Sequence, residues 1–322
     1  MIDLNKARDL IEKKIEAIQF SESPYQLYEP VAYIMSLGGK RLRPAMVLMG
    51  YNLFSQDYEK AIEPALGIEL FHNFTLLHDD IMDKADMRRG KLTVHKKWNE
   101  NTAILSGDAM CIMAYKYICK SEPQYLANVL QLFNKTALEV CEGQQYDMNF
   151  ESYADVSTSE YLKMIELKTS VLLAASLNMG AILAGAGEDD CKNLYEFGRL
   201  SGIAFQLRDD YLDVFGDPNV FGKKRGGDIL ANKKTYLLIR AFEKADEEDR
   251  EKLHSLLEEK NENTKINSII NLYEKLNIAA LTEEKTLEFM EASFNALNQT
   301  NVDEAKKDVL KELVEVFVKR TH

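Results

Sequence analysis

Two copies of one acidic pattern, Asp-Asp-x-x-Asp, lie inside segments whose apolar residues have helical spacing. We call them the first acidic cluster (Asp79, Asp80 and Asp83) and the second acidic cluster (Asp209, Asp210 and Asp213). On a helix the first and last Asp of each copy leave the same face one turn apart, where like charges repel. Burial beside apolar residues then requires a cation, and Mg²⁺ favours hard oxygen ligands together with substrate phosphates. The repeat therefore predicts a metal–diphosphate site between two facing helices.

The rest of the chain has the same helical spacing and few helix-breaking residues. Apolar residues recur three and four positions apart, and the 322 residues include only 6 Pro and 16 Gly. We predict helices over residues 3–20, 24–37, 43–55, 58–83, 99–119, 122–148, 158–184, 190–215, 232–244, 247–260, 262–297 and 302–319. No linker or tandem repeat divides them, and the two acidic clusters must converge to share metal ions. The sequence therefore predicts one all-α domain over residues 1–322.

Charge, cysteine usage and hydropathy argue against several other classes of protein. The net charge of −12 argues against a nucleic-acid partner. The four cysteines lie far apart without a Cys-x-x-Cys pair, which favours reduced thiols in the cytoplasm. The charged first helix lacks the apolar core of a signal peptide. Ser176 and Asn178 interrupt the most apolar stretch, 171–187, so we expect a buried core helix there and no stable membrane insertion.

A basic loop precedes the third predicted helix. Its sequence is Gly-Gly-Lys-Arg-Leu-Arg-Pro at residues 38–44, and its cations include Lys40 and Arg43. Exposed backbone N–H groups and cations beside a helix N-terminus form a ready anion site, and Pro44 suits the first helical turn. The loop does not have the spacing of a Walker motif, so ATP use is not expected.

Three further residues near the first acidic cluster carry polar chemistry. His72 lies seven residues before Asp79 and therefore points nearly the same way, two turns along the helix. Arg88 and Arg89 precede Gly90, and adjacent side chains diverge on a helix or a strand, so the two arginines could bind different anions. The alternatives are a hydrogen-bonded core histidine and a solvated surface charge run.

Polar residues also accompany the second acidic cluster. Gln206 precedes Asp209 and Asp210 by three and four residues and shares their helix face. A lysine in an otherwise apolar helix needs a negative partner, and a bound diphosphate would supply one. The candidates for phosphate binding here are Lys168, Thr169 and the basic segments 221–228 and 232–235, whose residues include Lys223 and Lys233.

These residues together indicate one type of reaction. The chain has two carboxylate groups for metal ions and several cation sites for phosphates, but no Ser-His-Asp, Cys-His, zinc or dinucleotide-binding pattern. Metal ions and cations that bind a diphosphate make it a leaving group, and the resulting carbocation needs an apolar pocket that excludes water. Hydrolysis would need an activated water, for which the sequence offers no evident residue.

The motifs closely resemble those of the trans-isoprenyl diphosphate synthases, also called polyprenyl synthetases. The matching motifs are Gly-Gly-Lys-Arg-Leu-Arg-Pro, both Asp-Asp-x-x-Asp patterns, Arg-Arg-Gly, Lys-Thr and Phe-Gln-x-x-Asp-Asp, and they extend from Gly38 to Lys233. The resemblance implies an isoprenoid-synthase helical bundle around a central cavity. It also implies a short-chain trans-prenyltransferase that condenses isopentenyl diphosphate with dimethylallyl, geranyl or farnesyl diphosphate and releases pyrophosphate.

The resemblance also implies roles for individual residues. Three Mg²⁺ ions per active site are implied, with Asp79, Asp83 and Asp209 as ligands. The implied isopentenyl diphosphate site consists of Lys40, Arg43, His72 and Arg89. The implied allylic diphosphate site consists of Arg88, Lys168, Thr169, Gln206, Lys223 and Lys233. Asp80, Asp210 and Asp213 are implied to be catalytic with these residues, Asp147 is implied to lie near the metals, and released pyrophosphate is the implied base.

Bulky residues before the first acidic cluster bear on product length. In this family the growing chain runs beside the first acidic helix, and such residues form the floor of its channel. Phe74, Thr75 and Phe71 precede Asp79 by five, four and eight residues. An aromatic residue at the fifth position, without an insertion in the first cluster, resembles the geranylgeranyl synthases. We expect mainly a C20 product with C15 as runner-up; the alternative is a floor supplied by another helix.

Two other functions remain open at this point. A class I terpene cyclase shares the helical fold and an acidic motif, but usually has a different second metal motif and lacks the basic loop. An inactive partner subunit of a heteromeric synthase usually loses an acidic cluster, whereas this chain has both. The family resemblance further implies a homodimer, for which the predicted helix 99–119 is a candidate interface.

Overall fold

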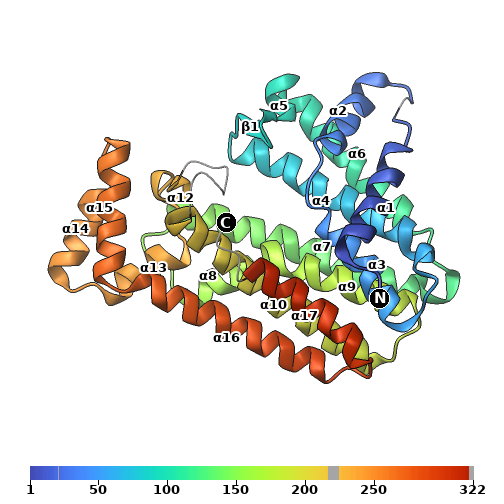
Figure 1. The fold of residues 1–322 in the computed structure, drawn as a ribbon. Coiled ribbons are helices and arrows are strands. Elements are labelled where there is room, and N and C mark those ends of the chain that lie inside the picture. The colour runs from blue at the N-terminus through green and yellow to red at the C-terminus, as the bar shows by residue number, and fades with distance from the viewer. Residues whose placement is uncertain (21, 217–224, 319–322) are drawn as a thin grey trace. The chain divides into compact units, whose positions relative to one another are not determined.

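The protein is helical in most of the part that the structure describes (Figure 1). The computed structural model describes residues 1–20, 22–216 and 225–318. Within these ranges the only sheet is a two-stranded hairpin, which confirms the all-α prediction. By its internal contacts the chain divides into two compact units.

Unit 1 consists of Met1–Thr136, Ala175–Tyr195 and Thr300–Lys306. The elements wholly within it are α1 (Leu4–Glu16), α2 (Tyr25–Ser36), α3 (Leu42–Phe54), the 3₁₀ helix η1 (Tyr58–Ala61), α4 (Ile62–Met82), β1 (Met87–Arg88), β2 (Lys91–Leu92), α5 (Val94–Lys97) and α6 (Glu100–Ile118). The helices with residues in both units are α7 (Pro123–Ser152), α9 (Val171–Leu183), α10 (Glu188–Phe215) and α17 (Glu304–Val318).

Helix α4 packs closely against α6 because glycines at their contact leave room for the neighbouring helix. A Cβ atom at Gly67 would lie 2.6 Å from Cγ1 of Ile118, and one at Gly107 would lie 2.3 Å from Nε2 of His78. Side chains larger than hydrogen would therefore push the two helices apart. This packing positions the last turn of α4, which carries the first acidic cluster.

The hairpin β1–β2 follows the first acidic cluster and turns at Arg89 and Gly90. Both residues have left-handed backbones, with φ of 53° and 74°. Two such residues form the tight turn that matches the twist of paired strands. Arg88 and Lys91 pair across the turn. The sequence predicted a break here, but neither the two strands nor the short helix α5 that follows.

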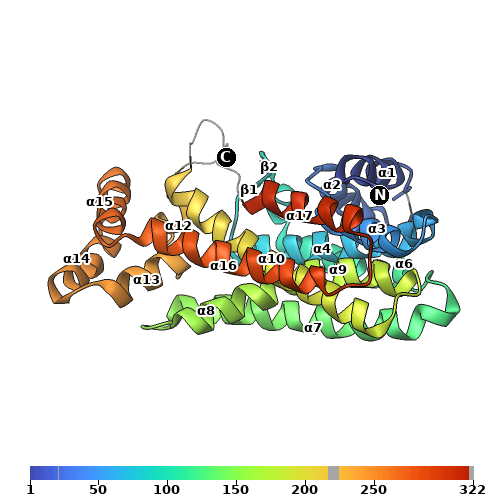
Figure 2. The same cartoon turned by 60° about the horizontal axis from the view of Figure 1, so that its bottom comes forward.

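Unit 2 consists of Ala137–Ala174, Glu196–Gln299 and Lys307–His322. The elements wholly within it are α8 (Thr158–Ile165), the π-helical segment η2 (Glu166–Ser170), α12 (Gly227–Leu230), α13 (Tyr236–Lys244), α14 (Glu247–Leu257), α15 (Glu262–Lys275) and α16 (Ile278–Asn298). Helices α14 and α15 lie next to each other in both views (Figure 1, Figure 2).

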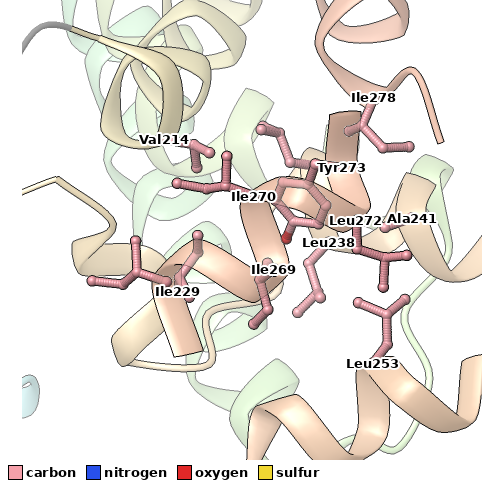
Figure 3. Packing of buried hydrophobic residues seen from close by; sticks show 12 residues of the cluster. Val214, Ile229, Leu238, Ala241, Leu253, Ile269, Ile270, Leu272, Tyr273 and Ile278 are labelled. Atoms are coloured by element: carbon pink, nitrogen blue, oxygen red, sulfur yellow. The ribbon is translucent and has the colours of Figure 1, made fainter. Parts of the chain in front are cut away.

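A hydrophobic core joins the end of α10 to α12, α13, α14 and α15 (Figure 3). Tyr273 of α15 lies within it at 2% exposure, beside aliphatic residues such as Leu238 and Ile270. Val214, also 2% exposed, is the contribution of α10. Because Val214 directly follows Asp213, this core holds the helix end that carries the second acidic cluster.

The predicted helix over 158–184 contains one wide π turn, η2, between α8 and α9. Glycines of the neighbouring helices approach this turn closely. A Cβ atom at Gly143 would lie 2.2 Å from the backbone N of Lys168, and one at Gly202 would lie 2.7 Å from Cα of Ser170. Such π turns often occur at functional sites, and this one carries Lys168 and Thr169.

The apolar run Thr158–Leu183 is long enough and apolar enough to span a membrane by composition alone. However, 78% of its most apolar window is buried within the structure. The run is therefore a core helix, as the sequence predicted for the apolar stretch 171–187.

Two predicted helices have the wrong extent. The helix predicted over 262–297 is broken at Asn277, whose φ of 58° is left-handed, a conformation that Asn tolerates better than most residues. The helix predicted over 232–244 begins only at Tyr236, because the Thr235 side chain caps it by accepting from the backbone N of Leu238. Other predicted bounds differ by a few residues, as at α1 and α7.

Candidate active site

The first acidic cluster lies at the C-terminal end of α4, where Asp83 is the C-cap residue. Unpaired carbonyl groups give a helix C-terminus a partial negative charge, which adds to that of the carboxylates and favours a cation. Arg88 of the hairpin donates from Nε to both oxygens of Asp80, at 2.9 and 2.8 Å, and its Nη2 lies 3.7 Å from Oδ2 of Asp79. Arg88 therefore pairs mainly with the buried Asp80, while Asp79 and Asp83 of the same cluster are more exposed.

The basic loop brings Arg43 to His72. Nη1 of Arg43 lies 3.1 Å from Nε2 of His72. Because arginine can only donate, this histidine nitrogen accepts, so the ring is neutral with its proton on Nδ1. Burial, and next the positive charge of Arg43, lower the pKa of His72 well below 6.5. The predicted proximity of His72 to the basic loop is thus present in the structure.

Burial lowers the pKa of Arg43 to about 10, and the charge of Glu69 opposes this shift. Nε of Arg43 is buried without a hydrogen-bond partner among the described residues. A buried donor of this kind requires an explanation, and a bound anion is one. Lys40 is exposed on the same loop.

Arg88 and Arg89 contact different parts of unit 1, as their adjacent positions predicted. Arg88 binds the first acidic cluster, whereas Arg89 donates from Nη1 to the backbone O of Gly38 in the basic loop. A Cβ atom at Gly39 would lie 2.8 Å from the Arg89 guanidinium, so only glycine leaves room for this side chain. One arginine therefore belongs to the acidic cluster and the other to the basic loop.

An aromatic cluster lies along α4 on the N-terminal side of the first acidic cluster. The Phe74 ring centroid lies 4.8 Å from that of His78 and 5.6 Å from that of Phe71. Phe71 is 2% exposed and meets Phe133 of α7 edge to face at 5.1 Å, and Tyr115 of α6 meets Phe133 at 4.9 Å. The third predicted floor residue, Thr75, bonds to the backbone O of His72. Three helices thus contribute to the cluster, so α4 does not form it alone.

The second acidic cluster lies in the last turns of α10, within unit 2. Oδ2 of Asp213 accepts from the backbone N of Asp228 at 3.0 Å. Asp210 is 4% exposed, and it accepts from the hydroxyl of Tyr161 and from Nε2 of Gln206. Burial, and then the charge of Asp228, raise the pKa of Asp210. Asp209 is partly exposed on the same helix.

The predicted allylic residues of unit 2 are already paired with protein groups. Nζ of Lys168 donates to Oδ2 of Asp147 at 2.6 Å, so Asp147 supplies the negative partner that the sequence required. The hydroxyl of Thr169 donates to Oε1 of Gln206 at 3.4 Å. Lys233 is exposed, and its backbone N donates to the O of Asp228. Lys223 lies outside the described residues.

The two acidic clusters have the donor chemistry that Mg²⁺ requires. Carboxylate oxygens on successive turns at a helix end are hard ligands, and Mg²⁺ is usually bound by one or two carboxylates together with substrate phosphates. In the part of the chain that the structure describes, no three Asp, Glu, His or Cys side chains are already grouped as a metal site. The residues therefore fit a metal that binds together with a diphosphate.

Sequence analysis assigned no role to two residues that organise these groups. Arg41 is buried beneath the basic loop, in ion pairs with Glu12 and Glu69. Tyr161 donates to Asp210 and is 2% exposed. The sequence signal for Arg41 is that three cations, Lys40, Arg41 and Arg43, stand within four residues of one short loop. Helical periodicity alone treats Tyr161 as an ordinary core residue.

An all-helical fold, acidic helix ends and arginines that serve two separate groups define the class of helical isoprenoid-diphosphate enzymes. Residues 24–275 match the family model described as polyprenyl synthetase. The chain belongs to this family, as its motifs implied.

Comparison with individual proteins agrees with this assignment. A geranylgeranyl diphosphate synthase of Methanosarcina mazei is 45% identical over 223 residues, which is 69% of this chain and 69% of the relative. A crystal structure of a geranylgeranyl pyrophosphate synthetase from Pyrococcus horikoshii superposes with a TM-score of 0.92 at 37% identity, covering 98% of this chain and 97% of the other. A geranylfarnesyl diphosphate synthase of Natronomonas pharaonis is 30% identical over 98% of this chain and 96% of its own length.

Proposed function

We propose that this protein is a geranylgeranyl diphosphate synthase. It condenses isopentenyl diphosphate with dimethylallyl, geranyl or farnesyl diphosphate, gives mainly the C20 product and releases pyrophosphate. The observation that carries the proposal is that the adjacent Arg88 and Arg89 contact different groups. Arg88 binds the first acidic cluster and Arg89 binds the basic loop, so each group has an arginine of its own. A protein that joins two diphosphate substrates needs two such groups. The names of its relatives support the same product.

In the proposed reaction the chain's own residues bind and orient the two diphosphate substrates and shield the carbocation from water. Arg88, Lys168, Thr169, Gln206, Lys223 and Lys233 hold the allylic diphosphate, and Lys40, Arg43, His72 and Arg89 hold isopentenyl diphosphate. The allylic C–O bond breaks, the homoallylic double bond forms a C–C bond with the cation, and the proton lost from the adduct passes to released pyrophosphate. The aromatic cluster below α4's acidic end excludes water from the apolar chain.

Asp79, Asp83 and Asp209 are the proposed ligands of three Mg²⁺ ions, which when bound neutralise the diphosphate and make it a better leaving group. Support comes from the position of both acidic clusters in the last turns of their helices, α4 and α10. Joint action of the two clusters on one diphosphate is part of the proposal.

Phe74 tests the proposed C20 product. It is the phenylalanine of the aromatic cluster nearest the acidic end of α4, so Phe74→Ala should open the floor and shift products towards C25 and longer. Purified enzyme with Mg²⁺, isopentenyl diphosphate and each primer in turn, followed by mass analysis of the products, measures the shift. Phe150→Ala, in a separate hydrophobic cluster of unit 2, is a matched control that should leave product length unchanged. An unchanged product distribution in Phe74→Ala would remove Phe74 as the floor.

The same incubation separates the alternatives. A main C15 product would favour the farnesyl synthase, cyclic hydrocarbons would favour a class I terpene cyclase, and no turnover would favour an inactive subunit. The geranylfarnesyl relative makes a longer product a further outcome to watch for.

We also propose that the enzyme is a cytoplasmic homodimer acting as one domain. Leu105 and Ile112, seven residues apart on α6, are 60% and 71% exposed, which is unusual for large apolar side chains and suits a partner surface. The helices α7, α9, α10 and α17 contain residues of both units, which supports cooperative unfolding as one domain. Light scattering that gives the mass of one chain would contradict the dimer.

A further inference from the structure

Arg41 lies in the basic loop between Lys40 and Arg43, yet its side chain is only 1% exposed. Its Nε donates to Oε2 of Glu12 at 2.8 Å, and its Nη1 donates to Oε1 of Glu69 at 2.6 Å. Its Nη2 donates to the backbone O of Met35 at 2.6 Å and to Oε1 of Glu12 at 3.4 Å. Four of its five N–H groups are thus bonded within the protein, which leaves Arg41 unsuited to bind a substrate.

These bonds tie the basic loop to three helices. Glu12 belongs to α1, Met35 to α2 and Glu69 to α4. The Arg41 backbone is left-handed, with φ of 45°, and it forms the N-cap of α3. A residue other than glycine is strained in this conformation and keeps it only where its surroundings hold it. The bonds of the Arg41 side chain provide that restraint.

Glu69 links this network to the residue that contacts His72. It is 2% exposed, and Oε1 also accepts from Nδ2 of Asn73 at 2.9 Å. Its charge already stabilises the charged form of Arg43 against burial. A buried carboxylate that loses one cation is strongly unfavourable. Without Arg41, Glu69 would therefore compete with His72 for Arg43.

We propose that Arg41 is a positioning residue for isopentenyl diphosphate. Its bonds to Glu12, Glu69 and the carbonyl of Met35 fix the left-handed conformation of the loop. This conformation positions Lys40 and maintains the contact between Arg43 and His72. This inference rests on the proposed function, because that function assigns the loop to isopentenyl diphosphate. It predicts that loss of Arg41 weakens the binding of isopentenyl diphosphate and leaves the binding of the allylic diphosphate nearly unchanged.

The first experiment measures KM for each substrate in the full-length Arg41→Met variant. We expect KM for isopentenyl diphosphate to rise about tenfold or more, since a charge-assisted network is lost. KM for farnesyl diphosphate and kcat at saturation should stay within about threefold. A general loss of stability would not produce this division between the substrates. Arg41→Lys keeps the charge but not the forked geometry, and should lie between the wild type and Arg41→Met.

The double variant Arg41→Met/Glu69→Gln tests the role of Glu69. Removing the unpaired carboxylate should leave Arg43 on His72, so the double variant should recover at least about a third of the lost affinity for isopentenyl diphosphate. If Arg41→Met does not fold, Glu12→Gln keeps the Glu69 pair and should raise the same KM about two- to threefold. Asp249→Asn is the matched control, because it removes a buried acidic partner of Lys275 in unit 2 and should leave both KM values unchanged.

Two results would overturn the proposal. One is a folded Arg41→Met enzyme with unchanged KM for isopentenyl diphosphate, and the other is an equal rise in both KM values. If the wild-type protein shows no turnover, the proposed function fails instead. Calorimetric titration with isopentenyl diphosphate then tests Arg41 directly, and equal affinities of wild type and Arg41→Met would refute its positioning role.

Discussion

The two units hold their predicted diphosphate-binding residues in different ways. In unit 1, Arg43 contacts a neutral histidine, while Arg41 pairs with the buried Glu69 and the partly exposed Glu12. In unit 2, Lys168 is already paired with Asp147, and Gln206 is already bonded to Asp210. At the basic loop of unit 1, Glu12 and Glu69 thus pair with a structural arginine, which leaves the charge of Arg43 unpaired by a carboxylate, whereas Arg88 of the same unit pairs with Asp80. In unit 2, Asp147 instead neutralises Lys168, and Asp210 accepts a hydrogen bond from Gln206, so carboxylates already engage two residues expected to bind substrate.

This difference suggests that an anion meets the basic loop directly, whereas in unit 2 it must compete with protein carboxylates. Competition is easier for a diphosphate whose charge is shared with metal ions, because the carboxylates can then move to the metals. We therefore expect isopentenyl diphosphate to bind without Mg²⁺ and the allylic substrate to depend on it.

The largest effect is expected at the proposed metal ligands, where variants of the two units should behave alike. Asp79→Asn in unit 1 and Asp209→Asn in unit 2 should each lower kcat by about 10²–10³, because each removes a charge that holds the leaving group's metal. Steady-state kinetics at saturating Mg²⁺ measures this. The exposed Asp108 of α6 provides a control, since Asp108→Asn should keep kcat within twofold. A normal kcat in either ligand variant would argue against a shared metal site.

A smaller effect is expected on the binding of the allylic diphosphate in unit 2, with opposite signs for variants of Lys168 and Asp147. Lys168→Met should weaken binding of the allylic diphosphate by about 10-fold to 100-fold, because a charge-assisted contact is lost. Asp147→Asn should strengthen that binding in the absence of Mg²⁺ by a fewfold, because the ammonium loses its protein competitor. Equilibrium binding of an allylic diphosphate without metal compares the two. Weaker binding in both variants would show that Asp147 orients Lys168 and does not compete for it.

The smallest effect is a pH dependence of stability in unit 1. Burial and nearby arginines keep His72 neutral by lowering its pKa, so below pH 6.5 the unfolded chain binds a proton that the folded protein does not. The free energy of unfolding should then decrease as pH falls below about 6.5, by at most about 1.4 kcal/mol per pH unit from this group. His72→Gln should remove that decrease in urea unfolding at pH 7.5 and 5.5. If His72→Gln leaves the pH dependence of the free energy of unfolding unchanged, the prediction is wrong. It is also wrong if His254→Gln, at an exposed site, reduces that dependence as much as His72→Gln does.

Much of the fold followed from local patterns, and the errors have local causes. Periodicity predicted the long helices because an amphipathic helix buries one face, as α1 does with Ala7, Ile11 and Ile15. It failed at Asn277 and Tyr236, where a left-handed residue and a capping threonine override an apolar pattern. The π turn at Lys168 was also not predicted, because helical periodicity carries no sign of the close approach of Gly143, which lies far away in the sequence.

By itself, the sequence determined the helical class, the family motifs and the residue types available for metal ions and phosphates. These are set by spacing along single helices and short loops. Only the tertiary structure decided which basic side chains face inward. Arg41 and Arg43 are two residues apart, yet one is bound among three helices and the other contacts His72. The reason is physical: the direction of a charged side chain depends on buried carboxylates such as Glu69, which only folding brings beside it.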